Sequence, residues 1–499
     1  MSDTISATPL KLAYAFAKES GLVVLDAASR PARIGARGQP DPQALLEVRR
    51  IVNAPIAIDT MPSDAFERRL SEIYSAAAIR ADDYKMEGSE DDLATLAEGL
   101  PATADLLDTE DDAPVIRLIN AIIAEAVKLK ASDIHVEPYE RTLSIRLRID
   151  GVLREILSLP SRMTPVLTSR VKVMARLDIA EKRLPQDGRI SLSLGGKMID
   201  VRVSTLPARF GERVVLRILD KEEANFDLDA LGMPADTLKR LHQSLQRPNG
   251  IILVTGPTGS GKTTTLYASL KLLNDPSRNI LTVEDPVEYA IDGVGQTQIN
   301  PKVGMTFATG LRAILRQDPD IVMVGEIRDV ETAEIAIQAS LTGHLVLSTV
   351  HTNSAVGAIT RLRDMGAEPF LLSSTIAAVL AQRLVRRLCP TCKEPHATDE
   401  AERRLLGAGA EATIYRAKGC GRCGHTGYEG RVGVYEMMVV DEHARKLIHE
   451  NAGEQELTAH VFRRVDSLAQ AGFRHVLAGT TSLEEVLRVV RQDEDDAVV

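Results

Sequence analysis

The sequence predicts a multidomain α/β protein built around a mostly parallel β-sheet that is covered by helices on both faces. From residue 248 onward, apolar strands alternate with helical stretches, which is typical of such a sheet. One apolar strand, residues 251–255, runs directly into a glycine-rich turn and a helix. Four cysteines in two pairs after residue 385 predict a small metal-binding module beyond the sheet.

Length and composition fit several globular domains. The 499 residues leave room for three or four domains of about 150 residues each. The formal net charge is −10, and the chain has nine Tyr, eight Phe and no Trp, which argues against a protein that stacks many bases. No segment has the roughly 20 apolar residues of a membrane span, and the N-terminus lacks a secretory signal. We therefore expect a cytoplasmic protein.

Residues 1–80 are interpreted as a small helical or mixed domain with a docking role. Residues 81–112 hold twelve acidic residues and one basic residue, Lys85, which favours a flexible linker. An acidic docking segment for a basic partner is the alternative.

Residues 113–225 predict an α+β domain. Helical spacing between residues 118 and 129 precedes a strand at 143–149, whose polar face carries Arg146 and Arg148. Asp150-Gly151 predicts a tight hairpin turn, and Gly195-Gly196 lies between a second pair of strands.

The sheet domain is predicted at residues 226–385, with strands at 251–255, 280–284, 321–325 and 345–350. The turn after the first strand matches a phosphate-binding loop at every fixed position. We predict that nine residues bind ATP: Gly256, Pro257, Thr258, Gly259, Ser260, Gly261, Lys262, Thr263 and Thr264. Lys262 would reach the β- and γ-phosphates, and Thr263 would bind Mg²⁺.

The other three strands also end in polar groups, namely Glu284, Glu326 and His351. Because ligands bind beyond the carboxyl ends of parallel strands, these side chains are expected to converge on one nucleotide. The strand at 321–325 has Gly325 where a metal-binding Asp is usual, so Glu326 is assigned to orient the attacking water. Glu284 is a candidate for metal or water contact, and His351 for sensing the γ-phosphate. His344, at the opposite end of its strand, is expected to be structural or to lie at an interface.

An arginine often neutralises the charge that develops during phosphoryl transfer. Arg146 and Arg148 are predicted to play this part from a neighbouring domain or subunit. The further candidates are Arg154, Arg202, Arg213 and Arg217.

All four cysteines lie in two C-x₂-C knuckles, Cys389/Cys392 and Cys420/Cys423. The pattern favours a structural Zn²⁺ held by four thiolates in a module at residues 386–435, over a redox or disulfide role. Residues 436–499 predict a helical C-terminal region. The basic cluster Arg383, Arg386 and Arg387 could contact anionic lipid, although such clusters are more often solvated or interface patches.

Four segments resemble the traffic ATPases of the secretion superfamily. They are similar to its phosphate loop, its acidic "Asp box", its Walker B strand without the Asp, and its "His box": GPTGSGKTTT at 256–265, EDPVEY at 284–289, LRQDPDIVMVGEIRD at 315–329 and LTGHLVLSTVHTNSA at 341–355. MARLDIAEKRLPQDGRISL at 174–192 and GERVVLRILDK at 211–221 resemble the type II secretion branch.

The resemblance implies a RecA-like ATPase domain in a homo-hexamer, with Glu326 as the catalytic glutamate, Glu284 as the Asp-box acid, and His344 and His351 as the His-box pair. It also implies that residues 1–80 dock on the cytoplasmic domain of an inner-membrane secretion protein. A polytopic inner-membrane platform protein is a further expected partner, and the chain would be peripheral on the inner membrane. The implied activity is ATP hydrolysis that drives pseudopilus assembly and protein export.

Three alternatives stay open at this point. A type IV pilus assembly ATPase shares every catalytic motif. A nucleic-acid translocase is disfavoured by the net acidity and the few aromatics, and no nucleic-acid partner is expected. A nucleotide-gated scaffold would bind ATP with negligible turnover.

Overall fold

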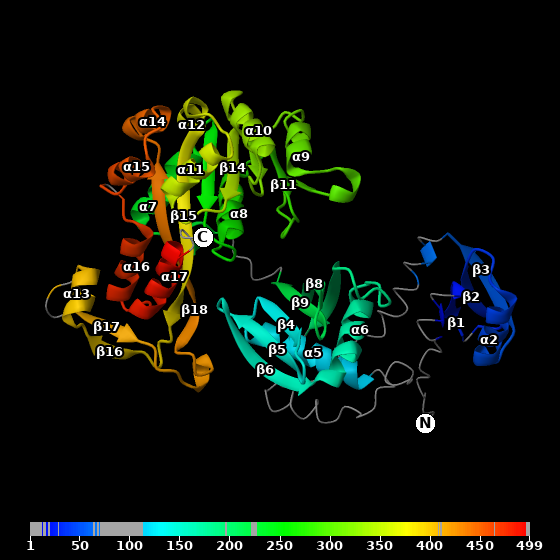
Figure 1. The fold of residues 1–499 in the computed structure, drawn as a ribbon. Coiled ribbons are helices and arrows are strands. Elements are labelled where there is room, and N and C mark those ends of the chain that lie inside the picture. Colours follow the sequence, from blue (N-terminus) through cyan, green and yellow to red (C-terminus); the bar gives the residue numbers. More distant parts are fainter. Residues whose placement is uncertain are drawn as a thin grey trace. The chain divides into compact units, whose positions relative to one another are not determined.

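The computed structural model describes residues 20–62 apart from 28, then 113–194, 197–220, 227–407, 412–463 and 465–495, with a few isolated positions elsewhere. It contains two compact units, Met1–Glu223 and Ala224–Val499 (Figure 1). The predicted linker at 81–112 and the predicted turn at Gly195-Gly196 lie outside the described residues.

The N-terminal region combines a small sheet with a helix. Strands β1 (Leu22–Asp26), β2 (Ala32–Arg37) and β3 (Ile56–Met61) form the sheet in that order, and α2 (Pro42–Val52) lies between the second and third strands in sequence. The side chain of Asp41 accepts a hydrogen bond from the backbone of Gln43 and so caps α2. The mixed form of the prediction is therefore the correct one, and a purely helical domain is wrong.

The second half of this unit is an α+β domain. Its six-stranded antiparallel sheet has the order β6-β5-β4-β9-β8-β7. The strands are β4 (Asp133–Pro138), β5 (Thr142–Ile149), β6 (Val152–Pro160), β7 (Gln186–Leu194), β8 (Lys197–Ala208) and β9 (Gly211–Asp220), and the helices are α5 (Ala113–Lys128) and α6 (Thr164–Met174). Apolar side chains of both helices pack on one face of the sheet. Asp150 and Gly151 have φ of 48° and 83°, which confirms the predicted hairpin turn.

The second unit is built on a seven-stranded sheet of order β12-β11-β13-β14-β10-β15-β18. All its strand pairs are parallel except that of β15 with β18. The strands are β10 (Gly250–Thr255), β11 (Ile280–Glu284), β12 (Gly295–Gln298), β13 (Ile321–Val324), β14 (Leu345–Val350), β15 (Ile376–Leu388) and β18 (Tyr428–Val439). The four predicted strands are thus confirmed to within one residue at each end.

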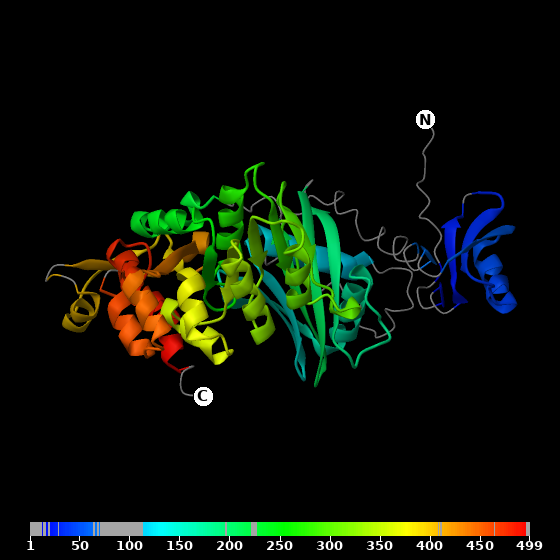
Figure 2. The same cartoon turned by 90° about the horizontal axis from the view of Figure 1, so that it is seen from above.

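Helices cover both faces of this sheet, and alternate residues of β10 pack into two different hydrophobic cores. Ile251 and Leu253 pack with helices α9 (Phe307–Ile314), α10 (Val330–Leu341), α11 (Ala355–Asp364) and α12 (Pro369–Thr375). Ile252 and Val254 pack with α7 (Ala235–Leu245) and α8 (Lys262–Leu273). The ribbon has helices on both sides of the sheet (Figures 1 and 2). This period of two is what a doubly covered strand requires.

The cysteine module is an extension of the main sheet. Strand β15 continues past the predicted boundary at 385 and ends one residue before Cys389, and β18 returns from the second knuckle to pair with it. Between them lie β16 (Glu394–Ala397), α13 (Glu400–Leu406) and β17 (Thr413–Arg416). Four helices follow, α14 (Glu442–His449), α15 (Glu454–Val461), α16 (Leu468–Leu477) and α17 (Leu483–Asp495). Within the described ranges, no helix is both long and apolar enough to span a bilayer.

Candidate nucleotide site and tetracysteine cluster

The strand order places the predicted site residues along one edge of the sheet. Strands β11, β13, β14 and β10 are consecutive neighbours, so Glu284, Glu326, His351 and the loop after Thr255 all lie at or just beyond their carboxyl ends. The edge that the sequence predicted as the ligand site is therefore continuous.

The phosphate loop follows β10 directly. Gly256, Gly259 and Gly261 have φ of 148°, 79° and 87°, which L side chains rarely adopt. The Lys262 ammonium donates to the carbonyl oxygens of Gly256 at 2.7 Å and Pro257 at 3.0 Å. Burial lowers the pKa of Lys262 to about 8; the Glu326 carboxylate opposes this shift, and the Arg383 guanidinium adds to it. Lys262 is thus folded back onto the loop from which it would reach a phosphate.

Glu326 lies beside this lysine and is only 12% exposed at its side chain. It pairs with Arg328, and one of its oxygens lies 3.5 Å from His351 Nε2. Burial and the nearby Lys262 charge lower the pKa of His351. The structure therefore brings Lys262, Glu326 and His351 together, as the sequence predicted, and adds Arg328, which the sequence reasoning did not select.

Gly325, which stands where an Asp is usual, lies close to Phe307 and to the end of β11. A Cβ at Gly325 would lie 3.3 Å from the Phe307 ring, 3.4 Å from the Val283 carbonyl oxygen and 3.5 Å from Glu284 Cα. The contact with the ring is tight, whereas the two contacts with backbone atoms are ordinary van der Waals distances, so a Cβ here would require only a slight shift of the Phe307 ring.

Glu284 is held differently from Glu326. It is 4% exposed and accepts hydrogen bonds from Tyr267, from Thr282 at 2.6 Å and from Gln296 at 3.0 Å. Burial and the hydrogen bond to Glu284 raise the pKa of Tyr267, which therefore stays a donor. Tyr267 lies on α8, the helix that the phosphate loop opens, so Glu284 links the end of β11 to that helix. Sequence reasoning missed Tyr267 and Gln296, because nothing in their spacing marks them.

His344 lies at the opposite edge of the sheet, where β14 begins. Its Nδ1 contacts the carbonyl oxygen of Ala339 at 2.9 Å and the hydroxyl of Thr342 at 3.1 Å. These contacts close the turn after α10, which fits the structural reading of this histidine.

The arginines of the α+β domain are held by carboxylates on β4. Arg146 and Arg213 both pair with Glu137, the first at 2.5 Å, and Arg217 Nε lies 2.9 Å from Asp133. Arg148 lies 3.8 Å from the same Asp133. The two acids are nearly buried, whereas the arginine side chains are 30–53% exposed.

His135 lies between these two acids on the same strand, and its Nδ1 is 3.6 Å from Glu137. Burial, together with the Arg148 charge, lowers the pKa of His135. Four arginines thus share two carboxylates and a histidine with a depressed pKa on one sheet face. The alternation of Asp133, His135 and Glu137 was a visible signal for this cluster that the sequence reasoning did not use.

The four cysteine sulfurs form a compact cluster in which every pair lies within 4.8 Å. Neighbouring sulfurs are 3.8–4.0 Å apart, and a tetrahedral Zn²⁺ with Zn–S bonds of about 2.3 Å requires about 3.8 Å. Burial opposes ionisation of Cys423, but the N–H groups of Cys420 and Gly427 lower its pKa to about 6. The donor set and its spacing fit one metal ion with four thiolate ligands.

The predicted basic cluster before this module does not form a surface patch. Arg383 is 3% exposed and donates to the carbonyl oxygen of Asn353 at 3.0 Å. Arg386 pairs with Glu485 at 2.7 Å and stacks 4.0 Å above the Tyr428 ring. Arg387 alone is exposed. The three arginines therefore do not form the lipid-binding or solvated cluster that the sequence left open, because two of the three charges are used inside the fold.

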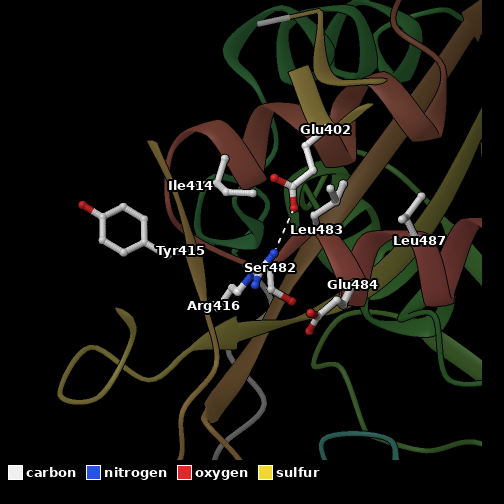
Figure 3. Close-up of a pocket in the computed structure, with 8 residues that line it drawn as sticks. All are labelled: Glu402, Ile414, Tyr415, Arg416, Ser482, Leu483, Glu484 and Leu487. Atoms are coloured by element: carbon white, nitrogen blue, oxygen red, sulfur yellow. Dashed lines mark hydrogen bonds and ion pairs between the residues drawn. The ribbon is translucent and has the colours of Figure 1, made fainter. Parts of the chain in front are cut away.

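A pocket of about 190 Å³ lies between β17 and the start of α17 (Figure 3). Ile414, Leu483 and Leu487 give it apolar walls, and the Glu402–Arg416 ion pair lies beside it. None of the predicted catalytic residues lines it, so it is separate from the phosphate loop.

Comparisons with known proteins agree with this architecture. The family model described as "Type II/IV secretion system protein" matches residues 108–488, and a model for an N-terminal domain of GSPII protein E matches residues 11–74. The chain is 57% identical to the type II secretion system protein E of Pseudomonas aeruginosa, over 98% of both chains. It is 56% identical to the type II secretion system ATPase E of Vibrio cholerae, over 90% of both.

Solved structures give the same fold. The pilus retraction motor PilT with bound ADP matches at 28% identity and a TM-score of 0.50, covering 74% of this chain and 95% of PilT. The Legionella pneumophila ATPase DotB matches at 22% identity and a TM-score of 0.55, covering 75% and 96%. The predicted RecA-like secretion ATPase fold and the prediction of an ATP-hydrolysing enzyme are thus confirmed. The chain belongs to the family of type II/IV secretion system proteins.

Proposed function

We propose that this chain is the motor ATPase of a type II secretion system, in which ATP hydrolysis drives pseudopilus assembly and the export of folded proteins across the outer membrane. The observation that carries the proposal is the juxtaposition of Lys262, Glu326 and His351 beside a complete phosphate loop. Near-full-length identity to proteins named for type II secretion favours this branch over pilus assembly. A nucleic-acid translocase or a scaffold without turnover has no comparable support.

The proposed chemistry assigns one task to each residue. The backbone N–H groups of residues 258–264 hold the phosphates, and Lys262 leaves its carbonyl partners to neutralise the β- and γ-phosphates. Glu326 orients the water that attacks the γ-phosphorus, so that the bond to the β-phosphate oxygen breaks and ADP leaves. His351 reports the presence of the γ-phosphate. Glu284 is the remaining acid for metal or water contact once it exchanges a present partner.

Two metal ions complete the proposal. Mg²⁺ would be held by Thr263 and would neutralise charge on the phosphates. Zn²⁺ would be held by Cys389, Cys392, Cys420 and Cys423; with four protein ligands it leaves no open position, so it stabilises the module and does no chemistry.

The assembly that we propose is a homo-hexamer. In it Arg146 and Arg148 reach the nucleotide from the α+β domain of a neighbouring subunit, after exchanging Glu137 and Asp133 for phosphate oxygens. The N-terminal domain would dock on the cytoplasmic domain of an inner-membrane secretion protein, and a polytopic platform protein would receive the motion. The chain would thus be cytoplasmic and peripheral on the inner membrane.

The test is ATP hydrolysis per chain as a function of protein concentration, beside Glu326→Gln. We expect a rate per chain that rises with concentration, because a neighbour completes the site, and that is abolished by the substitution. A rate independent of concentration would reject the role of the neighbour. Turnover that survives in the Glu326→Gln variant would reject the assignment of the catalytic glutamate.

A further inference from the structure

Gln382 lies on β15 at the point where the main sheet meets the phosphate loop. Thr255, the last residue of β10, pairs with Ala381, so Gln382 is the next residue along and stands opposite the first loop glycine. The residue is 2% exposed. None of the motifs that identify the site contains this residue.

The two ends of the Gln382 amide contact two parts of the phosphate-binding element. Its Nε2 donates to the carbonyl oxygen of Ser260 at 2.6 Å. Its Oε1 accepts from the Thr265 hydroxyl on α8 at 2.8 Å. The primary amide is suited to this place, because it offers a donor and an acceptor on one planar group.

The loop glycines pack closely against the same residue. A Cβ at Gly256 would lie 2.5 Å from the Gln382 carbonyl oxygen, and a Cβ at Gly261 would lie 3.1 Å from Gln382 Nε2. The first and the last glycine of the loop therefore both pack against Gln382.

The bond to Ser260 fixes the direction of one loop N–H group. In a trans peptide the C=O of Ser260 and the N–H of Gly261 belong to one plane and point in opposite directions. A donor that holds this carbonyl on the β15 side therefore turns the Gly261 N–H away from β15. Loop N–H groups that are oriented before binding form the anion site of a phosphate loop.

We propose that Gln382 is a positioning residue for nucleotide binding, which orients the Ser260–Gly261 peptide toward the phosphates. The inference rests on the proposed nucleotide-binding function. Gln382 itself does not touch the nucleotide; it acts through the loop. If the Gln382 amide is removed, the buried Ser260 carbonyl oxygen loses this donor. The loop must then be ordered when the nucleotide binds, and this cost lowers the nucleotide affinity.

The experiment measures Mg·ADP binding to the full chain by calorimetry for wild type, Gln382→Met, Gln382→Glu and Ser269→Ala. Methionine keeps the length and apolar volume but removes both hydrogen bonds. Ser269 is the matched control, because it is 2% exposed and lies on α8, the helix that carries Thr265. Its hydroxyl donates one hydrogen bond, to the carbonyl oxygen of Thr265 at 2.8 Å. We expect Gln382→Met to raise the Kd about tenfold or more, since two hydrogen bonds are lost, and Ser269→Ala to change it less than about threefold.

Gln382→Glu supplies a readout that a merely structural role would not move. As a carboxylate it cannot donate to Ser260, but as a neutral acid it can. Burial beside a carbonyl oxygen raises the pKa of such a carboxyl. The affinity of this variant, relative to wild type at the same pH, is therefore expected to recover as the pH falls from about 8 to about 5.5.

The outcomes separate this inference from the proposed function. If wild type binds Mg·ADP and Gln382→Met binds within about threefold of it, Gln382 has no positioning role and the ATPase proposal is untouched. If Gln382→Met does not fold, the pH profile of Gln382→Glu decides, and a flat ratio to wild type overturns the inference. If wild type binds nucleotide but does not hydrolyse ATP, the motor proposal fails and the Gln382 result stands. Wild type that binds no nucleotide overturns both.

Discussion

The ion pairs of Glu485 predict a large and local change of stability. This carboxylate is 1% exposed on α17 and accepts from Arg386 on β15, through the guanidinium at 2.7 Å and the backbone N–H at 3.2 Å. Arg488 donates to it twice, at 2.9 and 2.7 Å. Glu485 thus ties the last helix to the strand that leads to Cys389, and Glu485→Gln removes the charge that both guanidiniums share.

The expected loss is about 1.5–3 kcal/mol, because hydrogen bonds to a charged group are lost while Arg386 and Arg488, which are 18% and 45% exposed, keep access to water. Because the chain has several domains, one free energy of global unfolding is not well defined. The assay is therefore native-state hydrogen exchange of the backbone amides of α17. The opening free energy should fall by this amount, so exchange should accelerate by about one to two powers of ten.

Glu400→Gln is the matched control. It makes the same chemical change in a Glu–Arg pair, but Glu400 and Arg404 are 80% and 81% exposed on α13. Exposed pairs one helical turn apart contribute about 0.3–0.5 kcal/mol, so exchange on α13 should change less than about threefold. If the Glu485 variant were also within threefold of wild type, the arginines would have found equal solvation elsewhere and the reasoning would be refuted.

Four further predictions follow from the site and its surroundings. Without nucleotide, the pKa of Lys262 is about 8, whereas a bound polyphosphate favours the charged ammonium. ATP affinity, measured by calorimetry, should therefore fall above pH 8 by up to about tenfold per pH unit. An affinity that stays constant to about pH 9.5 would contradict this. Arg146→Ala removes the arginine that is proposed to neutralise the developing charge; it should lower kcat about tenfold while leaving the ADP Kd unchanged, and a parallel loss of both would count against this role. Treatment with a strong chelator should remove one Zn²⁺ per chain by elemental analysis and open residues 389–427 to protease, whereas metal-free protein as purified would defeat the zinc assignment. Burial raises the pKa of Glu485, but the hydrogen bonds from Arg488 and Arg386 outweigh burial and leave this pKa below its usual value. The stabilisation by Glu485 is therefore complete above the unfolded pKa of about 4.3 and is lost as the pH falls through the lower pKa of the folded state. Hydrogen exchange of α17 at about pH 6 and about pH 3.5 would detect this loss.

The strands and the phosphate loop could be predicted from the sequence because their signals are local. A fully buried parallel strand is a short apolar run, and the loop glycines are required by backbone geometry, so Ile251 through Thr263 could be interpreted correctly without any partner. The convergence of Glu326 and His351 followed from one topological rule about strand ends.

The residues that could not be predicted act through contacts between distant parts of the chain. Tyr267, Gln296 and Gln382 are ordinary polar residues in sequence, and only the packing of α8, β12 and β15 gives them partners. The interpretation of the basic cluster as a surface patch was wrong for the same reason. Charge in sequence does not reveal that Arg383 faces Asn353 or that Arg386 faces Glu485, because the partners lie 30 and 99 residues away.

The pairing of β15 with β18 makes the cysteine module the connection of a long hairpin. Leu388 pairs with Tyr428, so the whole of 389–427 closes a loop between two hydrogen-bonded strands. The entropy of closing a loop grows only with the logarithm of its length, so the sheet tolerates such an insertion at small thermodynamic cost. It also raises the sequence separation of the β15–β18 contacts, which slows their formation during folding. A metal ion that joins the two knuckles near the base of this hairpin would hold β15 and β18 close together before they pair. The β15–β18 edge of the ATPase sheet would then form sooner when the ion is present.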